Sequence, residues 1–296
     1  MEEKTCIVTG SSSGIGKGTA LLLAILGADV IMLSRDNKRG RLAFREIKQA
    51  SKSDKVEWIP TDLSSQQSVH DFVEVFKNKY KKLDVLFNCA GVLFKNRIIT
   101  IDGLEGMFAA NYLGHYLLTN LLFDYLKTDS PSMVVTISGR RHKILLSEGT
   151  NGKSIDFDDL QGEKDFNIAK ASKQATLAKI LFTYEVARRW GRYGIYACTL
   201  CPGSTRTNFF NNLPWRVRIY YNARFLIKNA QTPENAAKHL IKLASNTSCQ
   251  EVNGKYYEAS NNILREARSS DESYDELLAK RLWEVSENLV GQRFNY

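Results

Sequence analysis

Residues Thr9-Gly10-Ser11-Ser12-Ser13-Gly14-Ile15-Gly16 follow the apolar run Cys6–Val8 near the start of the chain. The apolar series Ala20–Leu26 comes next, so this order predicts a strand, a glycine-rich turn and a helix. Glycines lack Cβ and let the backbone approach a pyrophosphate closely, and the helix N-terminus offers that anion unpaired N–H groups and partial positive charge. We therefore expect a dinucleotide at this turn. The residues expected to contact it are Gly10, Ser12, Ser13, Gly14, Ile15 and Gly16.

The chain has 296 residues, of which 43% are hydrophobic, so it can bury one large core. No apolar run is long enough to span a membrane, and we expect neither a signal peptide nor a transmembrane anchor. Its five cysteines are odd in number and scattered, which is typical of a reducing cytosol. Cys198 and Cys201 lie in a strand-like run, whose period of two puts them on opposite faces. We therefore expect a cytoplasmic protein without a redox pair or a metal site.

The net charge of +9 is the second bulk property that limits the function. Lysine and arginine are spread along the chain, and no nucleic-acid-binding motif is present. A phosphate-bearing cofactor, together with an anionic membrane surface, accounts for this charge better than nucleic acid does. The composition therefore predicts a peripheral contact with membranes and no nucleic-acid partner.

Strand and helix patterns alternate along the whole chain. The predicted strands are Thr5–Thr9, Val30–Ser34, Val56–Thr61, Val85–Asn88, Met133–Ser138, Ile195–Cys201 and Lys255–Tyr257. The predicted helices are Gly16–Leu26, Arg39–Lys48, Ser65–Tyr80, Leu104–Leu126, Ala169–Trp190, Pro233–Leu243 and Tyr274–Val290. This alternation predicts one α/β domain over 1–296, a doubly wound parallel sheet with helices on both faces. Two weakly periodic segments, 139–165 and 208–230, follow strand ends and should border the pocket.

Several short motifs occur in an order that is typical of one protein family. They are Thr9–Gly16, Asp62–Leu63, Asn88–Gly91, Asn111–His115, Leu181–Arg189 and Pro202–Thr207. Over nearly its whole length the chain resembles the short-chain dehydrogenase/reductases, and within them the retinol-dehydrogenase-like branch. The resemblance implies a Rossmann-type domain that binds a nicotinamide dinucleotide. It also implies cofactor contacts at Asp62, Leu63, Asn88, Ala90, Gly91, Pro202, Gly203 and Thr207.

The end of the second predicted strand indicates which nicotinamide cofactor is used. Relatives specific for NAD place an acid there to bond the ribose hydroxyls. Here Arg35 stands at that end, and with help from Lys17 and Lys38 it can pair with a 2′-phosphate that an acid would repel. Asp36 is acidic but comes one residue late. We therefore expect NADP(H).

The family's catalytic residues are a Ser, a Tyr, a Lys four positions after the Tyr, and an Asn. A gapless comparison from Leu177 to Gly203 puts Ser172 at the Tyr position and Thr176 at the Lys position. The Ser position falls on Gly139, with Ser138 just before it, and only Asn111 matches. The resemblance therefore implies that three of the four catalytic residues are substituted.

Shifted registers do not restore the Tyr–Lys pair. One shift pairs Ala169 with Lys173, and others pair Phe166 with Lys170 or Lys173, but neither Ala nor Phe carries a hydroxyl. Ser172 is a weak acid, and no lysine on its helix face lies nearer than Lys179, about two turns further along.

Two histidines are the remaining candidates for a proton donor. His115 and His142 could titrate near neutrality, although a lone histidine is more often structural. General acid–base catalysis contributes about 10² to 10⁴ in rate. We therefore expect ordinary carbonyl reduction to be nearly abolished.

Two functions of different classes fit these substitutions. The first is an oxidoreductase with a non-standard active site that acts on a lipophilic small molecule. It would reduce an activated C=C bond while Asn111 and Ser172 polarise a carbonyl group. The second is a catalytically inactive pseudoenzyme that binds NADP(H) as a sensor, scaffold or partner subunit. The ligand-bordering segments favour the enzyme slightly.

Two further expectations concern surfaces. The helix that carries Ser172 and Thr176, together with 104–126, should form a homodimer, as the family's four-helix interface would imply, although its apolar residues would equally serve the core. The segment 209–228 mixes aromatic and basic residues. Its position after Pro202–Thr207 predicts a mobile lid over a lipophilic substrate, and an ordinary amphipathic helix that caps the pocket is the favoured interpretation. The alternative is that the segment also touches membranes.

Overall fold

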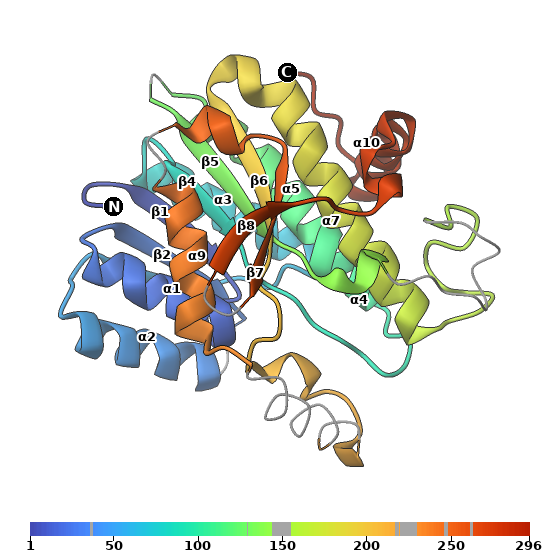
Figure 1. The fold of residues 1–296 in the computed structure, drawn as a ribbon, viewed down its shortest axis with the longest axis horizontal. Helices are drawn as coiled ribbons and strands as arrows, with labels where there is room; N and C mark the ends of the chain where they lie inside the picture. Colours follow the sequence, from blue (N-terminus) through green and yellow to red (C-terminus); the bar gives the residue numbers. More distant parts are fainter. Residues whose placement is uncertain are drawn as a thin grey trace.

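One eight-stranded sheet forms the centre of the molecule (Figure 1). The computed structural model describes residues 1–35, 38–128, 130–143, 155–216, 219, 230–245, 248–260 and 263–296. The strand order is β3-β2-β1-β4-β5-β6-β7-β8, and every pair is parallel except β7 with β8. The strands are β1 (Thr5–Thr9), β2 (Asp29–Ser34), β3 (Val56–Pro60), β4 (Val85–Asn88), β5 (Ser132–Ile137), β6 (Ile195–Cys201), β7 (Lys255–Ser260) and β8 (Ile263–Ala267).

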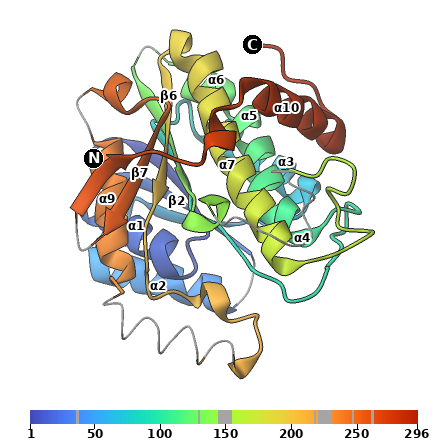
Figure 2. The ribbon, with the colours of Figure 1, turned by 45° about the vertical axis from the view of Figure 1, so that its right-hand side comes forward.

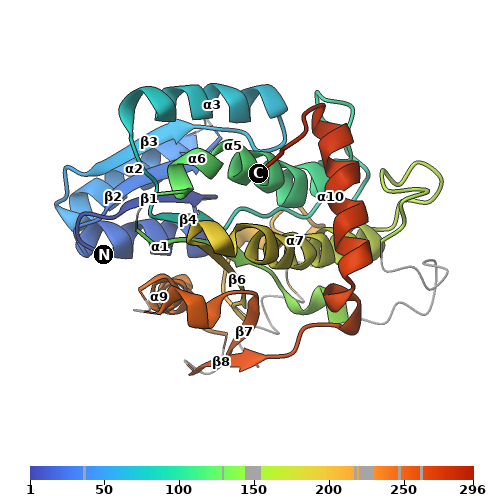
Figure 3. The ribbon, with the colours of Figure 1, turned by 90° about the horizontal axis from the view of Figure 1, so that it is seen from above.

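Helices cover both faces of this sheet, as predicted. On one face lie α1 (Gly14–Ile25), α2 (Lys38–Ser51) and α9 (Pro233–Ala244), which share a hydrophobic cluster with Cys6 and Val8. On the other face lie α3 (Gln66–Lys79), α5 (Gly114–Leu121) and α7 (Ile168–Trp190), which share a second cluster with Ile7. Figure 3 shows α3 and α5 on one side of the sheet and α1 and α9 on the other. Because both faces are covered, the central strands are nearly continuous apolar runs.

The predicted helix over 104–126 is broken into shorter pieces. These are α4 (Gly106–Phe108), a π-helical turn (Ala109–Leu113), α5 and α6 (Phe123–Leu126). The Glu105 carboxylate accepts the N–H groups of Met107 and Phe108, which starts the helix at Gly106. The π-helical turn holds Asn111. Such turns are common at functional sites because they re-aim a side chain.

The edge strand β8 was not predicted. It pairs antiparallel with β7 and is mostly exposed, with Arg265 and Glu266 in its centre. An edge strand that faces water needs no apolar run, so the sequence carries little signal for it. The prediction of a wholly parallel sheet was therefore wrong at this edge.

The helix α10 (Glu276–Val290) packs across α7 (Figure 2). The Tyr112 and Ser286 hydroxyls are 2.7 Å apart, and the rings of Tyr116 and Trp283 meet edge to face at 5.1 Å. The apolar side chains of α7 and 104–126 are thus buried within the chain, which is the alternative weighed for them. The homodimer stays a prediction.

The five cysteines pack in or against the hydrophobic clusters of the sheet. All five cysteines are free, and Cys198 and Cys201 pack in different hydrophobic clusters, as the period of two predicted. In the described ranges, no three His, Cys, Asp or Glu side chains are grouped as metal ligands. Within the same ranges, no helix has the length and apolar character needed to cross a bilayer.

Candidate active site

A cleft of about 530 Å³ lies at the carboxyl ends of the parallel strands. Its walls come from the β1–α1 turn, the ends of β2 to β6, and α7. This is where doubly wound sheets bind ligands, and the volume is that of a small-molecule pocket. The described parts of the two segments expected to border the pocket contribute Gly139, Arg140 and Arg141 at one rim and 208–212 at another.

The glycine turn forms the middle of the cleft and fits a pyrophosphate. Ser13 precedes α1 but its side chain makes no capping hydrogen bond, and the first turn of α1 has no acid. Three other helices are capped by Ser65, Asn167 and Thr232. The first N–H groups of α1 are therefore open to an anion. Gly10 has φ +66°, and a Cβ there would lie 2.7 Å from the Ala90 Cα, so only glycine fits.

The cleft reaches the end of β2, where the 2′-phosphate was expected. Arg35 lines the cleft there, and Asp62 and Leu63 line it at the end of β3. Arg39, on the first turn of α2, also lines it, although the sequence analysis did not select it. The carboxylate of Asp62 accepts the N–H and hydroxyl of Ser64 at 2.9 and 2.7 Å. This end of the cleft is therefore lined by Arg35, Arg39 and Asp62, and the carboxylate of Asp62 is already hydrogen-bonded to Ser64.

The two lysines proposed to assist Arg35 do not line the cleft. Lys17 forms an ion pair with Glu46, which accounts for its charge. Lys38 also lies outside the lining. Arg39, one residue after Lys38 in the first turn of α2, lines the cleft instead of the two lysines. Asp36 lies outside the described residues.

A buried network centred on Thr9 joins β1, β4 and α5. The Thr9 Oγ1 accepts the N–H groups of Cys89 and Ala90 and lies 2.9 Å from His115 Nε2. The His115 Nδ1 lies 3.0 Å from the carbonyl oxygen of Asn111, which can only accept, so Nδ1 carries the proton. Burial lowers the pKa of His115 to about 3. His115 therefore does not titrate near neutrality, and its buried hydrogen bonds agree with the structural role that was favoured for it.

Asn111 and Asn88 have different positions relative to the cleft. Asn111 lines it, and its side-chain amide accepts the Val92 N–H at 2.7 Å and donates to the Val92 carbonyl at 2.9 Å. Asn88 was expected at the cofactor but does not line the cleft. It is fully buried and donates to the Thr119 hydroxyl, so it braces β4 against α5. The sequence motif alone does not show that the Asn88 side chain is buried, whereas Ala90 and Gly91 of the same motif line the cleft.

The three positions that the resemblance aligns with the family's catalytic Ser, Tyr and Lys lie together in the cleft. Gly139, Ser172 and Thr176 all line it, and Ser172 is buried. The Thr176 hydroxyl donates to the Ser172 carbonyl oxygen at 2.7 Å, so it is occupied within the helix. Ser138 also lines the cleft, and its buried Oγ has no hydrogen-bond partner among the described residues. The described part of the lining contains no tyrosine.

Lys179 is the one lysine in the described part of the lining. Its side chain is buried, and Nζ donates a hydrogen bond to the Ile137 carbonyl oxygen at 2.9 Å. Burial lowers the pKa of this amine to about 8. The sequence analysis placed Lys179 near the face of Ser172 but too far along the helix to act on it. Side chains on a helix tilt toward its N-terminus, which explains how a residue this far along α7 can line the cleft.

Comparisons with known proteins agree with this geometry. A family model described as short chain dehydrogenase matches residues 4–144. Human retinol dehydrogenase 14 is 35% identical over 308 residues, which cover 98% of this chain and 87% of that protein. Human polyprenol dehydrogenase is 34% identical over 297 residues, which cover 98% of this chain and 86% of that protein. The chain belongs to the short-chain dehydrogenase family, in its retinol-dehydrogenase-like branch.

Solved structures with the Rossmann-type fold superpose on this chain. An uncharacterised protein from Mycobacterium paratuberculosis superposes with a TM-score of 0.71 at 26% identity, covering 100% of this chain and 96% of the other. Levodione reductase superposes with a TM-score of 0.71 at 18% identity, covering 88% and 97%. The predicted Rossmann-type α/β fold is confirmed.

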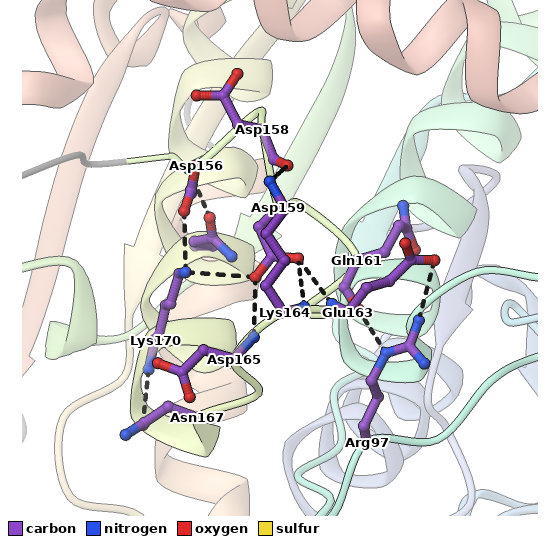
Figure 4. A network of polar contacts seen from close by, with 11 residues as sticks. Arg97, Asp156, Asp158, Asp159, Gln161, Glu163, Lys164, Asp165, Asn167 and Lys170 are labelled. Carbon is purple, nitrogen blue, oxygen red and sulfur yellow. Dashed lines mark hydrogen bonds and ion pairs between the residues drawn. The ribbon is translucent and has the colours of Figure 1, made fainter. Parts of the chain in front are cut away.

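Lys170 and Lys173, the lysines that a shifted register would use, lie outside the lining of the cleft. Lys170 forms ion pairs with Asp156 at 2.9 Å and Asp159 at 3.8 Å (Figure 4). The Asp159 carboxylate also accepts the backbone N–H groups of residues 163, 164 and 165. This network fixes the segment 155–167 against the start of α7. Neither Phe166 nor Lys173 lines the cleft, so no shifted register supplies a catalytic pair there.

His142 also lies away from the cleft. It does not line the cleft, its Nδ1 lies 2.6 Å from the Gly139 carbonyl oxygen, and its ring packs against Tyr256. Burial lowers its pKa to about 4. His142 therefore has the structural role that was favoured for a lone histidine, not a titration near neutrality.

The start of the expected lid forms one wall of the cleft. Phe209 and Phe210 line it and contact each other edge to face at 5.4 Å. A Cβ on Gly91 would lie 3.4 Å from the Phe209 ring, so this ring covers the loop after β4. Trp215 is 64% exposed. The other residues of the expected lid, 217, 218 and 220–228, lie outside the described residues.

Proposed function

We propose that this protein binds NADP(H) across the cleft. The observation that carries the proposal is the uncapped start of α1, which lies between two arginines at one end and the substituted catalytic positions at the other. The N–H groups of Gly14, Ile15 and Gly16 would take the pyrophosphate. Arg35 and Arg39 would take the 2′-phosphate, since guanidinium groups match the geometry of a phosphate.

We propose oxidoreductase chemistry with a non-standard active site. When bound, NADP(H) donates or accepts a hydride at its nicotinamide ring. The chain's own contribution would be to orient the substrate oxygen through the hydroxyls of Ser138 and Ser172. Asn111 stabilises the loop after β4 rather than contacting substrate, because both polar atoms of its amide are hydrogen-bonded to the Val92 backbone. These weak acids suit reduction of an activated C=C bond better than that of a ketone, which needs a proton donor at its oxygen.

The proposed substrate is a lipophilic small molecule. The aromatic rings of Phe94, Phe209 and Phe210 line the cleft. The names of the relatives point the same way, since they are dehydrogenases of retinol and of polyprenol. An apolar wall with a few polar groups is the usual make-up of a pocket for such ligands.

A pseudoenzyme remains the second candidate, and a specific contact favours it. The Thr176 hydroxyl is bonded to its own helix, and Gly139 has no side chain, so neither position retains a group for proton transfer. The protein would then bind NADP(H) as a sensor, scaffold or partner subunit.

Anaerobic single-turnover mixing separates the two functions. The protein is mixed with stoichiometric NADPH and a panel of enones, aldehydes and retinoids, and the absorbance of reduced nicotinamide is followed. Oxidation of NADPH with an enone supports the altered enzyme. NADPH that binds, by calorimetry, yet stays reduced with the whole panel supports the pseudoenzyme. Absence of NADPH binding would refute both.

A further inference from the structure

Lys179 is a buried cation that lacks a negative partner in the described structure. Its side chain is 8% exposed, and lysines are rarely so buried unless they are paired. Two titratable groups act on it or respond to its charge: the thiol of Cys89 after β4 and the imidazole of His115 on α5. Burial raises the pKa of the Cys89 thiol to about 12, so this group is a neutral thiol at physiological pH. His115 is neutral as well, because its pKa is far below 7.

The ammonium group has hydrogen-bonding capacity left over. It carries three donors, and one of them is used by the Ile137 carbonyl oxygen at 2.9 Å. Ile137 is the last residue of β5, directly before Ser138 and Gly139 in the lining. Lys179 itself lines the cleft together with Ser138, Gly139 and Ser172, so its remaining donors are available to a ligand bound there.

The helix geometry explains how Lys179 reaches this place. Seven residues separate it from Ser172, which brings both to nearly the same face of α7, about 20° apart. Thr176, at the family's lysine position, lies three residues before Lys179. A lysine side chain is long enough to lean back over one turn toward the helix N-terminus.

We propose that Lys179 supplies, from about one helical turn beyond the usual position, the cation that the substituted motif lacks, and that it binds sugar hydroxyl oxygens on the nicotinamide side of the nucleotide. This inference rests on the proposed binding of NADP(H). The start of α1 and the two arginines account for the phosphates, so the hydroxyls of the other half are the acceptors left for the end of β5. Lys179 is thus a cofactor-binding residue.

The charge of Lys179 gives the proposal a pH signature. An oxygen acceptor favours the ammonium over the neutral amine, so affinity is greatest below the pKa of about 8 and falls as pH rises above it. The adenine half, bound elsewhere, should show no such dependence at a pH where its phosphates are already fully ionised, above about pH 7.

Binding of the two halves of the nucleotide tests the proposal. Reduced nicotinamide mononucleotide and adenosine 2′,5′-bisphosphate are titrated separately into the wild type, Lys179→Met and Lys173→Met. Lys173 is the matched control, because it is equally buried on α7 but lies outside the cleft. We expect Lys179→Met to weaken the nicotinamide half roughly 10-fold to 100-fold, the effect of losing one charge-assisted hydrogen bond. We expect the bisphosphate to bind within about twofold of wild type.

The outcomes separate this inference from the proposed function. Wild-type protein that binds neither half would refute nucleotide binding itself. Wild-type binding of both halves with an unchanged Lys179→Met affinity, or with an equal loss in Lys173→Met, would refute the role of Lys179 alone. Should Lys179→Met fail to fold, the wild type is titrated from about pH 7 to about pH 9.5. A constant affinity for the nicotinamide half over that range would also overturn the proposal.

Discussion

The hydroxyl of Thr176 donates a hydrogen bond to the carbonyl oxygen of Ser172, 2.7 Å away, on the same face of α7. The family resemblance predicts that these positions correspond to its catalytic Lys and Tyr. In this chain they bond to each other within the helix, and the next polar group along that face is the amine of Lys179. The polar residues Ser172, Thr176 and Lys179 of α7 line the cleft. They differ from the Tyr and Lys of the family motif in chemical type, and the amine stands three residues later along the helix.

Wild-type protein should show negligible turnover of simple ketones and secondary alcohols. Restoring the motif with Gly139→Ser, Ser172→Tyr and Thr176→Lys together should raise the rate by about 10² to 10⁴, the contribution of general acid–base catalysis. Gly139 has room for the change, since a Cβ there meets nothing within 4 Å. Steady-state assays with NADPH measure the gain, and the double variant that keeps Gly139 is the control. Robust ketone reduction by the wild type would overturn this expectation.

Arg35→Glu should reverse the nucleotide preference from NADP(H) to NAD(H). The guanidinium attracts the 2′-phosphate and a carboxylate repels it, so a change of roughly 10-fold or more is expected. Arg39→Gln should weaken NADPH in the same direction, because Arg39 also lines the cleft. Lys38→Gln is the control from outside the lining. Titration calorimetry gives the affinities, and equal wild-type affinity for the two cofactors would contradict the prediction.

Folding stability should fall as pH decreases from about 6.5 to 5. His115 is neutral in the folded protein because burial lowers its pKa to about 3, whereas the unfolded chain binds a proton near pH 6.5. Its contribution is therefore complete above pH 6.5 and is lost below it, by about 2 kcal/mol at pH 5. Urea denaturation at pH 7 and pH 5 measures the change, and His115→Gln should reduce it. An equal pH dependence in that variant would assign the effect to other groups.

Anionic vesicles should bind the protein through the segment that contains Trp215 and Arg216. Trp215 is 64% exposed and can enter the interface between headgroups and acyl chains. We expect a blue shift of tryptophan fluorescence that decreases with salt and is absent in Trp215→Phe. Proteolysis within 209–228 should also slow when NADPH binds. If vesicles leave the spectrum unchanged at low salt and no ligand alters proteolysis, the segment is only structural.

Light scattering across a range of concentrations tests the predicted homodimer. A dimer through α7 has to form around α10, because Trp283 on α10 already packs against Tyr116 and Phe182. Twice the monomer mass is the expected result. A monomer mass at every concentration would agree with α10 covering this face and would contradict the dimer.

The parts of the site that could be predicted are those set by local backbone needs. The turn from Gly10 to Gly16 was recognised because glycines between a strand and a helix have few other uses. Arg39, Lys179 and the low pKa of His115 were missed because they depend on distant contacts. Lys179 meets a carbonyl group 42 residues earlier in the chain. The pattern of apolar and polar residues along a helix carries no information about a contact with a distant strand.

The Asp159 network has a consequence for the entropy of ligand binding. Its segment continues to Gln161, whose side chain accepts the Glu105 N–H at 2.6 Å just before α4 and the turn of Asn111. Asp156 of the same segment pairs with Lys170, which lies in the first turn of α7, the helix that carries Ser172. The elements that carry Asn111 and Ser172 are thus connected by groups that do not line the cleft. A bound molecule need not freeze these elements itself, so less of its interaction free energy is lost to ordering the protein.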